Sequence, residues 1–417
     1  MKRLRVILEH KKTLFLALVA FVLPWQTRYL FGGVLVGDVV SQFTMFSLYA
    51  TECLLLVGAV ALLRTWRWTN YRSVVFAVFG FVAIVLLSAV CSRFGFLAIH
   101  AVTHIAFAAL FLVLLLDDDV RVRPVVMAFV GGLIAPAFLG AYQILAGESG
   151  SSTLFGLAAR DAEQLGDAVV VIDGERVLRA YGSFPHPNIF GGYFALAVAM
   201  SVVVFSGRVR WALGGFTVVA LLMTASRAAL LAAVLAFMMF VGLSYARERA
   251  WMRRMTVVSV LLVLVASLAS VFVAPGALAS LRGGGATEER SVIERVEQYA
   301  IYPEVIRGAN LFVGLGPGTY VSNFALVEPG KSVWVYQPIH NALLLMIAEI
   351  GVLGALAVAA VGKKVRDVTR GSVVLPSFVA ALAALVIFDH YLWSMWPGLV
   401  LFAFALGVGI RATEQSA

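Results

Sequence analysis

The stretch from Ser73 to Cys91 reads SVVFAVFGFVAIVLLSAVC and contains no charged residue. As a helix, with a rise of about 1.5 Å per residue, it is long enough to cross the roughly 30 Å hydrocarbon core of a bilayer. Comparable apolar runs recur from one end of the chain to the other. We therefore expect most of the chain to lie within a membrane.

The overall composition supports the same expectation. The chain has 417 residues, of which 61% are hydrophobic and 13% charged, and its mean hydropathy is +0.94. A soluble domain usually carries about a quarter charged residues. The net charge of +9 comes from short basic clusters between apolar runs, which argues against a nucleic-acid-binding face. Cys53 and Cys91 each lie in an apolar run and predict neither a disulfide framework nor a metal site.

The periodic apolar runs predict an all-α polytopic membrane protein with about 12 transmembrane helices, forming a single integral membrane domain over residues 1–417. The expected spans lie near 13–31, 43–63, 73–91, 95–116, 124–146, 190–206, 211–225, 228–245, 255–273, 341–361, 373–390 and 395–411. A cytoplasmic N-terminus then places most of the 32 Lys and Arg residues on the inner side. By the positive-inside rule, both termini are expected to be cytoplasmic.

This orientation leaves two long segments outside, at 147–189 and at 274–340, the second of them a large loop between spans 9 and 10. In the first, the β-branched run at 169–172 before Asp173-Gly174 predicts a hairpin. The second opens with Pro275-Gly276 and Gly283-Gly284-Gly285, and the apolar spacing that follows at 292–300 predicts an amphipathic helix. Loops usually carry function, so we expect the active site on this face.

Two polar residues at the predicted outer ends of spans stand out. An Arg within a span costs roughly 2.5–3.5 kcal/mol, so Arg227 either extends its charge to the interface or faces an anionic substrate group. His340 is either structural or a proton acceptor, because the unperturbed pKa of histidine is near 6.5. Asn341 beside it could be a simple helix cap. For Glu349, further along the same helix, we expect a structural hydrogen bond.

Other polar groups favour structural roles. His100 and His104 have the i, i+4 spacing of paired metal ligands, but no acid on that helix completes a site, so hydrogen-bonded packing is favoured. Asp117-Asp118-Asp119 is expected to form a solvated cytoplasmic turn. Asp389-His390 resembles a hydrogen-bonded interfacial pair, and Glu52 has no explanation from the sequence.

Several local patterns follow one another on the predicted outer side. They are Arg179-Ala180-Tyr181-Gly182-Ser183-Phe184-Pro185-His186-Pro187-Asn188, Thr224-Ala225-Ser226-Arg227-Ala228, Ser291-Val292-Ile293-Glu294-Arg295, Gly314-Leu315-Gly316-Pro317-Gly318, and His340-Asn341-Ala342-Leu343 with Glu349-Ile350-Gly351. Together they resemble the O-antigen ligase and O-antigen polymerase family of bacterial inner-membrane glycosyltransferases. The motifs cover roughly residues 130–360.

The resemblance implies transfer of a glycan from a polyprenyl (undecaprenyl) pyrophosphate carrier to a sugar hydroxyl at the periplasmic face, most simply O-antigen ligation to the lipid A-core. The alternatives are an O-antigen or exopolysaccharide polymerase of the same family and, in a different class, a transporter or flippase of lipid-linked oligosaccharide. It further implies a multi-pass protein of the bacterial inner membrane that uses no metal or other cofactor. Its partners would be the lipid-linked donor, the lipid A-core or glycan acceptor and the bilayer, with no nucleic acid.

Carried over by position, His340 matches the essential histidine of the family and Arg227 and Arg295 match its arginines, with Arg179, Asn188 and Asn341 as further substrate-binding candidates. This set suits the chemistry. Arginine forks stabilise a pyrophosphate leaving group through charge-assisted hydrogen bonds. A positioned base accelerates attack by a hydroxyl about 10²–10⁴-fold.

Overall fold

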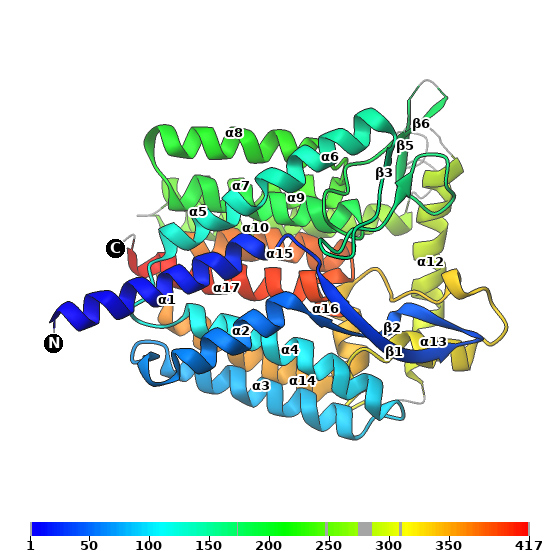
Figure 1. The fold of residues 1–417 in the computed structure, drawn as a ribbon, viewed down its shortest axis with the longest axis horizontal. Coiled ribbons are helices and arrows are strands. Elements are labelled where there is room, and N and C mark those ends of the chain that lie inside the picture. Colours follow the sequence, from blue (N-terminus) through cyan, green and yellow to red (C-terminus); the bar gives the residue numbers. More distant parts are fainter. Residues whose placement is uncertain (1, 173, 247–248, 274–285, 308–310, 416–417) are drawn as a thin grey trace.

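A computed structural model of the chain describes residues 2–172, 174–246, 249–273, 286–307 and 311–415. The protein is mostly helical, and the long helices run side by side as a bundle (Figure 1). Both termini lie at one end of the bundle, whereas the strands, α12 and α13 gather at the other end. The predicted Pro275-Gly276 and Gly283-Gly284-Gly285 turns lie outside the described residues.

The long helices are α1 (Lys2–Val22), α2 (Ala50–Ala61), α3 (Arg72–Val90), α4 (Gly95–Leu115), α5 (Val122–Gly132), α6 (Ile134–Ala146), α7 (Pro187–Val204), α8 (Gly207–Met223), α9 (Arg227–Tyr245), α10 (Ala250–Val273), α12 (Ala286–Ile306), α14 (Ala342–Val368), α15 (Val374–Phe388) and α17 (Trp396–Gln415). Shorter helices are α13 (Tyr320–Val327), α16 (Tyr391–Ser394) and the 3₁₀ turns Leu63–Thr65 and Val333–Val335. The strands are β1 (Arg28–Val36), β2 (Val39–Tyr49), β3 (Glu148–Ser149), β4 (Arg160–Asp161), β5 (Val169–Ile172) and β6 (Glu175–Leu178).

Within these described ranges, seven helical segments are long and apolar enough to cross a membrane, which confirms a mostly helical membrane protein. They are Arg72–Val90, Gly95–Leu115, Val122–Ala146, Pro187–Val204, Arg227–Tyr245, Ala342–Val368 and Trp396–Thr413. Two shorter apolar helices are α2 and α15. Each predicted span overlaps a helix of the bundle, but twelve crossings remain a prediction.

The first predicted span, 13–31, ends too late and the second, 43–63, begins too early, because residues 28–49 form the β1–β2 hairpin rather than helix. Arg28 pairs with Tyr49 at its open end and Val36 with Val39 at its turn. The turn contains Gly37 at φ +64°, a conformation that favours glycine. These strands are rich in Val, Phe and Tyr and directly adjoin apolar helical runs, so hydropathy alone did not separate the two. The predicted outer hairpin at 169–172 is confirmed as β5–β6, and the predicted amphipathic helix as α12.

Helix α7 lies at the centre of the bundle and brings other elements to its N-terminal end. It is buried from Pro187 to Ser201 on every face. A Cβ on Gly191 would lie 2.9 Å from the Cβ of Ala229 on α9, and a Cβ on Gly192 would collide with the hydroxyl of Tyr391 on α16. The two glycines therefore permit the start of α9 and α16 to approach the start of α7.

Helix α14 is interrupted at Gly351, where φ is +63° and ψ is −167°. The segment at 311–316 runs beside the break. The N–H groups of Val352 and Leu353 donate to the carbonyls of Leu311 and Phe312, and the carbonyls of Ala348 and Glu349 accept from Leu315 and Gly316. Irregular backbone at membrane depth is tolerated when protein groups satisfy it, as they do here.

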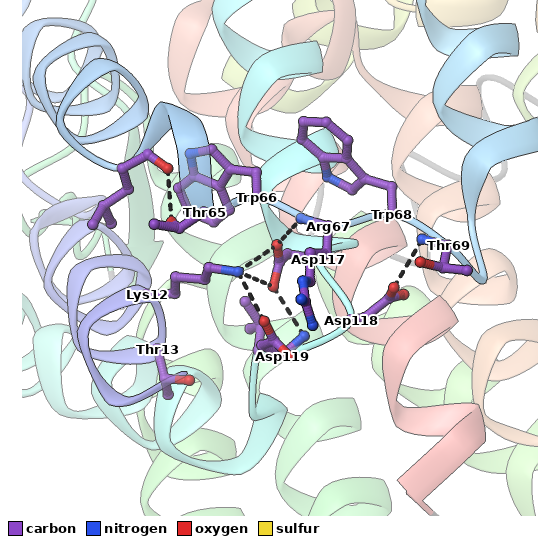
Figure 2. Close-up of polar contacts among 12 residues, drawn as sticks. Lys12, Thr13, Thr65, Trp66, Arg67, Trp68, Thr69, Asp117, Asp118 and Asp119 are labelled. Carbon is purple, nitrogen blue, oxygen red and sulfur yellow. Dashed lines mark hydrogen bonds and ion pairs between the residues drawn. The ribbon is translucent and has the colours of Figure 1, made fainter. Parts of the chain in front are cut away.

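At the end of the bundle that holds the termini, Asp117 forms a buried ion pair with Lys12, so the expectation of a solvated turn is wrong for this residue (Figure 2). Both side chains are 0% exposed, and Lys12 Nζ lies 2.9 Å from Asp117 Oδ2 and 3.0 Å from Asp119 Oδ2. Asp117 also accepts from the Arg67 amide, and Asp118 from the Thr69 amide. The cluster joins α1, the loop after α2 and the end of α4.

We predict that Lys12→Met destabilises the fold by about 3–5 kcal/mol, because it leaves the Asp117 carboxylate buried without its cation. Unfolding of the purified protein in mixed micelles, followed by circular dichroism during an SDS titration, measures the change. The matched control is Lys11→Met, since Lys11 is exposed on the same turn of α1. Equal stability of the two variants would contradict the prediction.

We also predict that Gly351→Ala destabilises the protein by about 1–3 kcal/mol, since an L-residue is strained at this φ and ψ. The added Cβ would also lie 2.5 Å from the Phe312 carbonyl oxygen. Gly80→Ala on α3 is the control, because nothing lies within 4 Å of its Cβ position and alanine favours a helix. The same SDS titration should show opposite shifts for the two variants.

Candidate active site

All six residues that the sequence predicted for the site gather at the end of the bundle opposite the termini. Elements far apart in the chain supply them, and α12 and α16 mark this end in Figure 1. The cluster contains Arg179 from the segment before α7, Asn188 at the start of α7, Arg227 at the start of α9, Arg295 on α12, and His340 and Asn341 just before α14. Three residues that were not predicted for the site join them, namely Gln298 on α12 and Asp389 and His390 between α15 and α16.

A chain of hydrogen bonds runs through the buried side of the cluster. Arg179 Nη2 donates to Asn188 Oδ1 over 2.9 Å, and Asn188 Nδ2 donates to Asp389 Oδ2 over 3.0 Å. The other oxygen of Asp389 accepts from the His390 amide over 2.8 Å. Arg179 Nε donates to the Thr224 carbonyl, which fixes the turn before α9. Asn188 thus links a cation to an anion and holds both in place.

The charges in this chain have defined states near neutral pH. Both oxygens of Asp389 accept hydrogen bonds, one from the Asn188 amide and the other from the His390 backbone, and these donors favour the ionised carboxylate. Burial lowers the pKa of Arg179 to about 10, with a smaller effect from Arg227, and leaves the group protonated at pH 7. Asp389 is therefore an anion and Arg179 a cation.

The imidazole of His340 is partly buried and neutral. Burial and the neighbouring His390 lower its pKa from the usual value of 6.5. The two rings meet edge to face, with centroids 5.2 Å apart. Nδ1 of His340 lies 2.7 Å from Gln298 Oε1, which also accepts from the His340 backbone amide over 3.1 Å. The ring is thus held from α12.

Arg227 and Arg295 form the cationic side of the site. Arg227 is exposed at the N-terminus of α9, where the helix dipole adds positive potential, and it lies near enough to Arg295 for the two charges to repel. Nε of Arg295 is buried and has no hydrogen-bond partner within the described part of the chain. A buried donor left without a partner costs about 1–3 kcal/mol, more when it is charged. The two arginine side chains therefore form a positively charged site that suits an anionic ligand.

Two of the predicted contact residues use their polar atoms within the scaffold. Asn341 caps α14, because its Oδ1 accepts from the Leu344 amide over 3.0 Å, and its Nδ2 donates to the Tyr299 hydroxyl over 3.3 Å. Asn188 is similarly engaged with Arg179 and Asp389. His186, to which the sequence assigned no role, is exposed and caps α7 by accepting from the Asn188 amide.

Sequence reasoning interpreted Asp389-His390 as a hydrogen-bonded interfacial pair rather than as part of the site, and it did not single out Gln298. An acid and a histidine at the predicted outer end of a span were visible in the sequence, but not their partners. Gln298 follows Arg295 by three residues on an amphipathic helix, so it could have been placed on the same face. No pattern in the sequence linked it to His340, 42 residues away.

The remaining polar candidates have structural partners. Glu349 accepts from the amides of Gly318 and Tyr320 and from Trp393 Nε1, so the predicted structural hydrogen bond is confirmed. His104 Nδ1 lies 2.5 Å from Glu52 Oε1, which accounts for that carboxylate. His100 Nε2 contacts the backbone of Ser47. Among the residues that the structure describes, no group of three His, Cys, Asp or Glu side chains could hold a metal ion.

Comparison with known proteins adds a family to this geometry. No curated protein matches the chain. Residues 212–359, which run from α8 into α14, match the family described as O-antigen ligase. This range contains Arg227, Arg295, Gln298 and His340, whereas Asn188 and Asp389 lie outside it. Over this segment, the chain is therefore similar to the O-antigen ligase family.

Proposed function

We propose that the protein transfers a glycan from a polyprenyl (undecaprenyl) pyrophosphate carrier to a sugar hydroxyl, most simply of the lipid A-core. The observation that carries the proposal is the convergence of two arginines and a neutral imidazole at one end of a membrane bundle. The family match supports the same chemistry over the segment that contains all three residues.

Arg227 and Arg295 would bind the pyrophosphate of the donor. The polyprenyl chain stays in the bilayer, and its head group meets Arg227 at the start of an apolar helix. Guanidinium groups donate paired hydrogen bonds to phosphate oxygens and disperse the charge that develops as the sugar–phosphate bond breaks. In this proposal the two arginines take the part that a metal ion plays in other transferases.

His340 would act as the general base. The acceptor oxygen attacks the anomeric carbon, its proton passes to the free nitrogen of the imidazole, and the electron pair of the breaking bond leaves with the pyrophosphate. Direct displacement inverts the anomeric carbon. The resulting imidazolium lies among groups that include the Asp389 carboxylate, whose negative charge stabilises it. Arg179, Asn188 and Asn341 would line the substrate and hold the charged groups in position.

We further propose that this end of the bundle faces the periplasm of a bacterium with the protein in its inner membrane. The loops at 147–189 and 274–340 then lie outside, and both termini lie in the cytoplasm. Both termini lie at the same end of the bundle, which supports an even number of membrane crossings, such as the twelve expected from the sequence.

The first prediction here concerns the base. His340→Ala should lower glycan transfer about 10²–10⁴-fold, because the acceptor hydroxyl loses its proton acceptor. The assay uses membrane vesicles from cells that lack the native gene, with gels of lipid-A-linked and carrier-linked glycan run side by side. His10→Ala, at the opposite end of the bundle, serves as the control.

Three outcomes separate the alternatives. Loss of the lipid A product with accumulation of carrier-linked chains supports ligation. Shorter chains with continued transfer to lipid A favour a polymerase. Wild-type protein that turns over no glycan in purified form but moves the carrier-linked substrate across vesicles would establish a flippase instead.

The second prediction concerns the arginines. Arg227→Lys and Arg295→Lys keep the charge but lose the planar fork, so each should lower kcat/KM for the donor about 10-fold or more. Initial rates over a range of donor concentrations measure the effect. Arg307→Lys is the matched control, because Arg307 is 75% exposed next to the end of α12 and pairs with Glu304. Wild-type rates in both test variants would argue against pyrophosphate binding at this position.

A further inference from the structure

We infer that Gln298 is a positioning residue that selects the tautomer of His340 and so directs its basic nitrogen toward the acceptor. The inference rests on the proposed function for its kinetic consequence but not for its structural content. Gln298 is 8% exposed, and no motif of the sequence pointed to it. Its side-chain oxygen makes two contacts with one residue, His340.

The first contact settles the orientation of the amide. A backbone N–H can only donate, so the atom of Gln298 that lies 3.1 Å from the His340 nitrogen must be the carbonyl oxygen Oε1. The same Oε1 lies 2.7 Å from His340 Nδ1. Because a carbonyl oxygen accepts and never donates, Nδ1 carries the proton. In a neutral imidazole the other nitrogen, Nε2, is then the acceptor.

This tautomer is the one that general-base chemistry requires. During transfer, Nε2 takes the proton of the acceptor hydroxyl, while the Nδ1 proton stays on the ring and continues to donate to Gln298. Without Gln298, both tautomers would be accessible, and one of them presents an N–H to the hydroxyl instead of a lone pair. The amide also fixes the plane of the ring through the same short contact.

An amide differs from a carboxylate at this position in its charge. Glu in place of Gln would still accept from Nδ1 but would add a negative charge 2.7 Å away and raise the pKa of His340. The groups that already influence this ring are His390, Asp389, Arg295 and His186. The neutral amide therefore selects the tautomer while leaving the imidazole uncharged.

The position of Gln298 depends on how α12 is fixed to the start of α14. Asn341 donates to the Tyr299 hydroxyl, and the Tyr302 hydroxyl donates to the Leu344 carbonyl over 2.9 Å. Arg295 lies one turn before Gln298 on the same helix. One helix thus supplies both a cation for the donor and the hydrogen-bond acceptor that orients the base.

The direct test is nitrogen-15 NMR of the full chain in lipid nanodiscs, labelled on histidine, with His340 assigned by the loss of its signals in His340→Gln. We expect a protonated Nδ1 and an unprotonated Nε2 at pH 7.5 in the wild type. Gln298→Leu should show both tautomers, and Glu297→Gln, an exposed neighbour, should show the wild-type spectrum. A wild-type Nε2–H tautomer, or an unchanged tautomer in Gln298→Leu, would overturn the inference.

The kinetic test uses transfer rates of the same variants. Gln298→Leu should lower kcat about 10- to 100-fold with little change in the KM of the donor, a smaller loss than removal of the base itself. Gln298→Glu should recover most of the rate at pH 8 but lose it on acidification, because the raised pKa of His340 brings its protonation into the range between pH 5 and 8. The wild type and Glu297→Gln should show no such titration.

The NMR spectra and the transfer rates distinguish failure of the inference from failure of the proposed function. If the wild type has the Nδ1–H tautomer but transfers no glycan, the proposed function fails and the positioning by Gln298 stands. If transfer requires His340 while Gln298→Leu keeps both wild-type kcat and a single tautomer, the positioning role fails and the proposed function stands. A melting curve of each variant excludes loss of fold, and Gln298→Glu keeps the test open if Gln298→Leu does not fold.

Discussion

A buried carboxylate requires partners, and the partners of Asp389 organise the end of the bundle that holds the candidate site. Its two oxygens accept from Asn188 on α7 and from the backbone of His390, and its carbonyl accepts from the Ala342 amide at the start of α14. Asn188 passes the connection on to Arg179 and through it to the turn before Arg227. A charge left unpaired in this setting would cost several kcal/mol, so each of these segments is held where the carboxylate needs it.

The membrane imposes a second constraint on the same region, because every backbone group at that depth must find a partner. The break in α14 at Gly351 leaves amides and carbonyls exposed, and the segment at 311–316 satisfies them. The carboxylate of Glu349, just before the break, accepts three further hydrogen bonds. The glycine-rich segment at 314–318 is therefore packed against α14 at this break.

Helix α12 completes the site from the outside. It belongs to the segment predicted as the large loop and brings Arg295, Gln298 and Tyr299 to the start of α14. The buried Nε of Arg295 and the neighbouring Arg227 make the site electropositive on one side, whereas Asp389 makes it negative on the other. A neutral histidine lies between these two sides. In the proposed reaction, this division would separate the binding of the anionic leaving group from the acceptance of a proton.

The sequence by itself determined the membrane class, because runs such as 73–91 have no other stable environment, and it predicted six of the polar residues that gather at one end. It also predicted the outer hairpin and α12 from short-range periodicity. It misjudged residues 28–49, where strand and span have the same hydropathy, and Asp117, whose cation lies 105 residues away.

The sequence likewise did not predict the hydrogen-bond partners of His340 and Asp389. Hydrogen bonds such as those from His340 to Gln298 and from Asn188 to Asp389 join positions 42 and 201 residues apart. Local patterns report only the local environment of a residue, whereas these pairings depend on how distant helices pack, as where Gly191 and Gly192 near the start of α7 let α9 and α16 approach. Which side chains meet, and in which tautomer and charge state, was therefore decided by the tertiary packing alone.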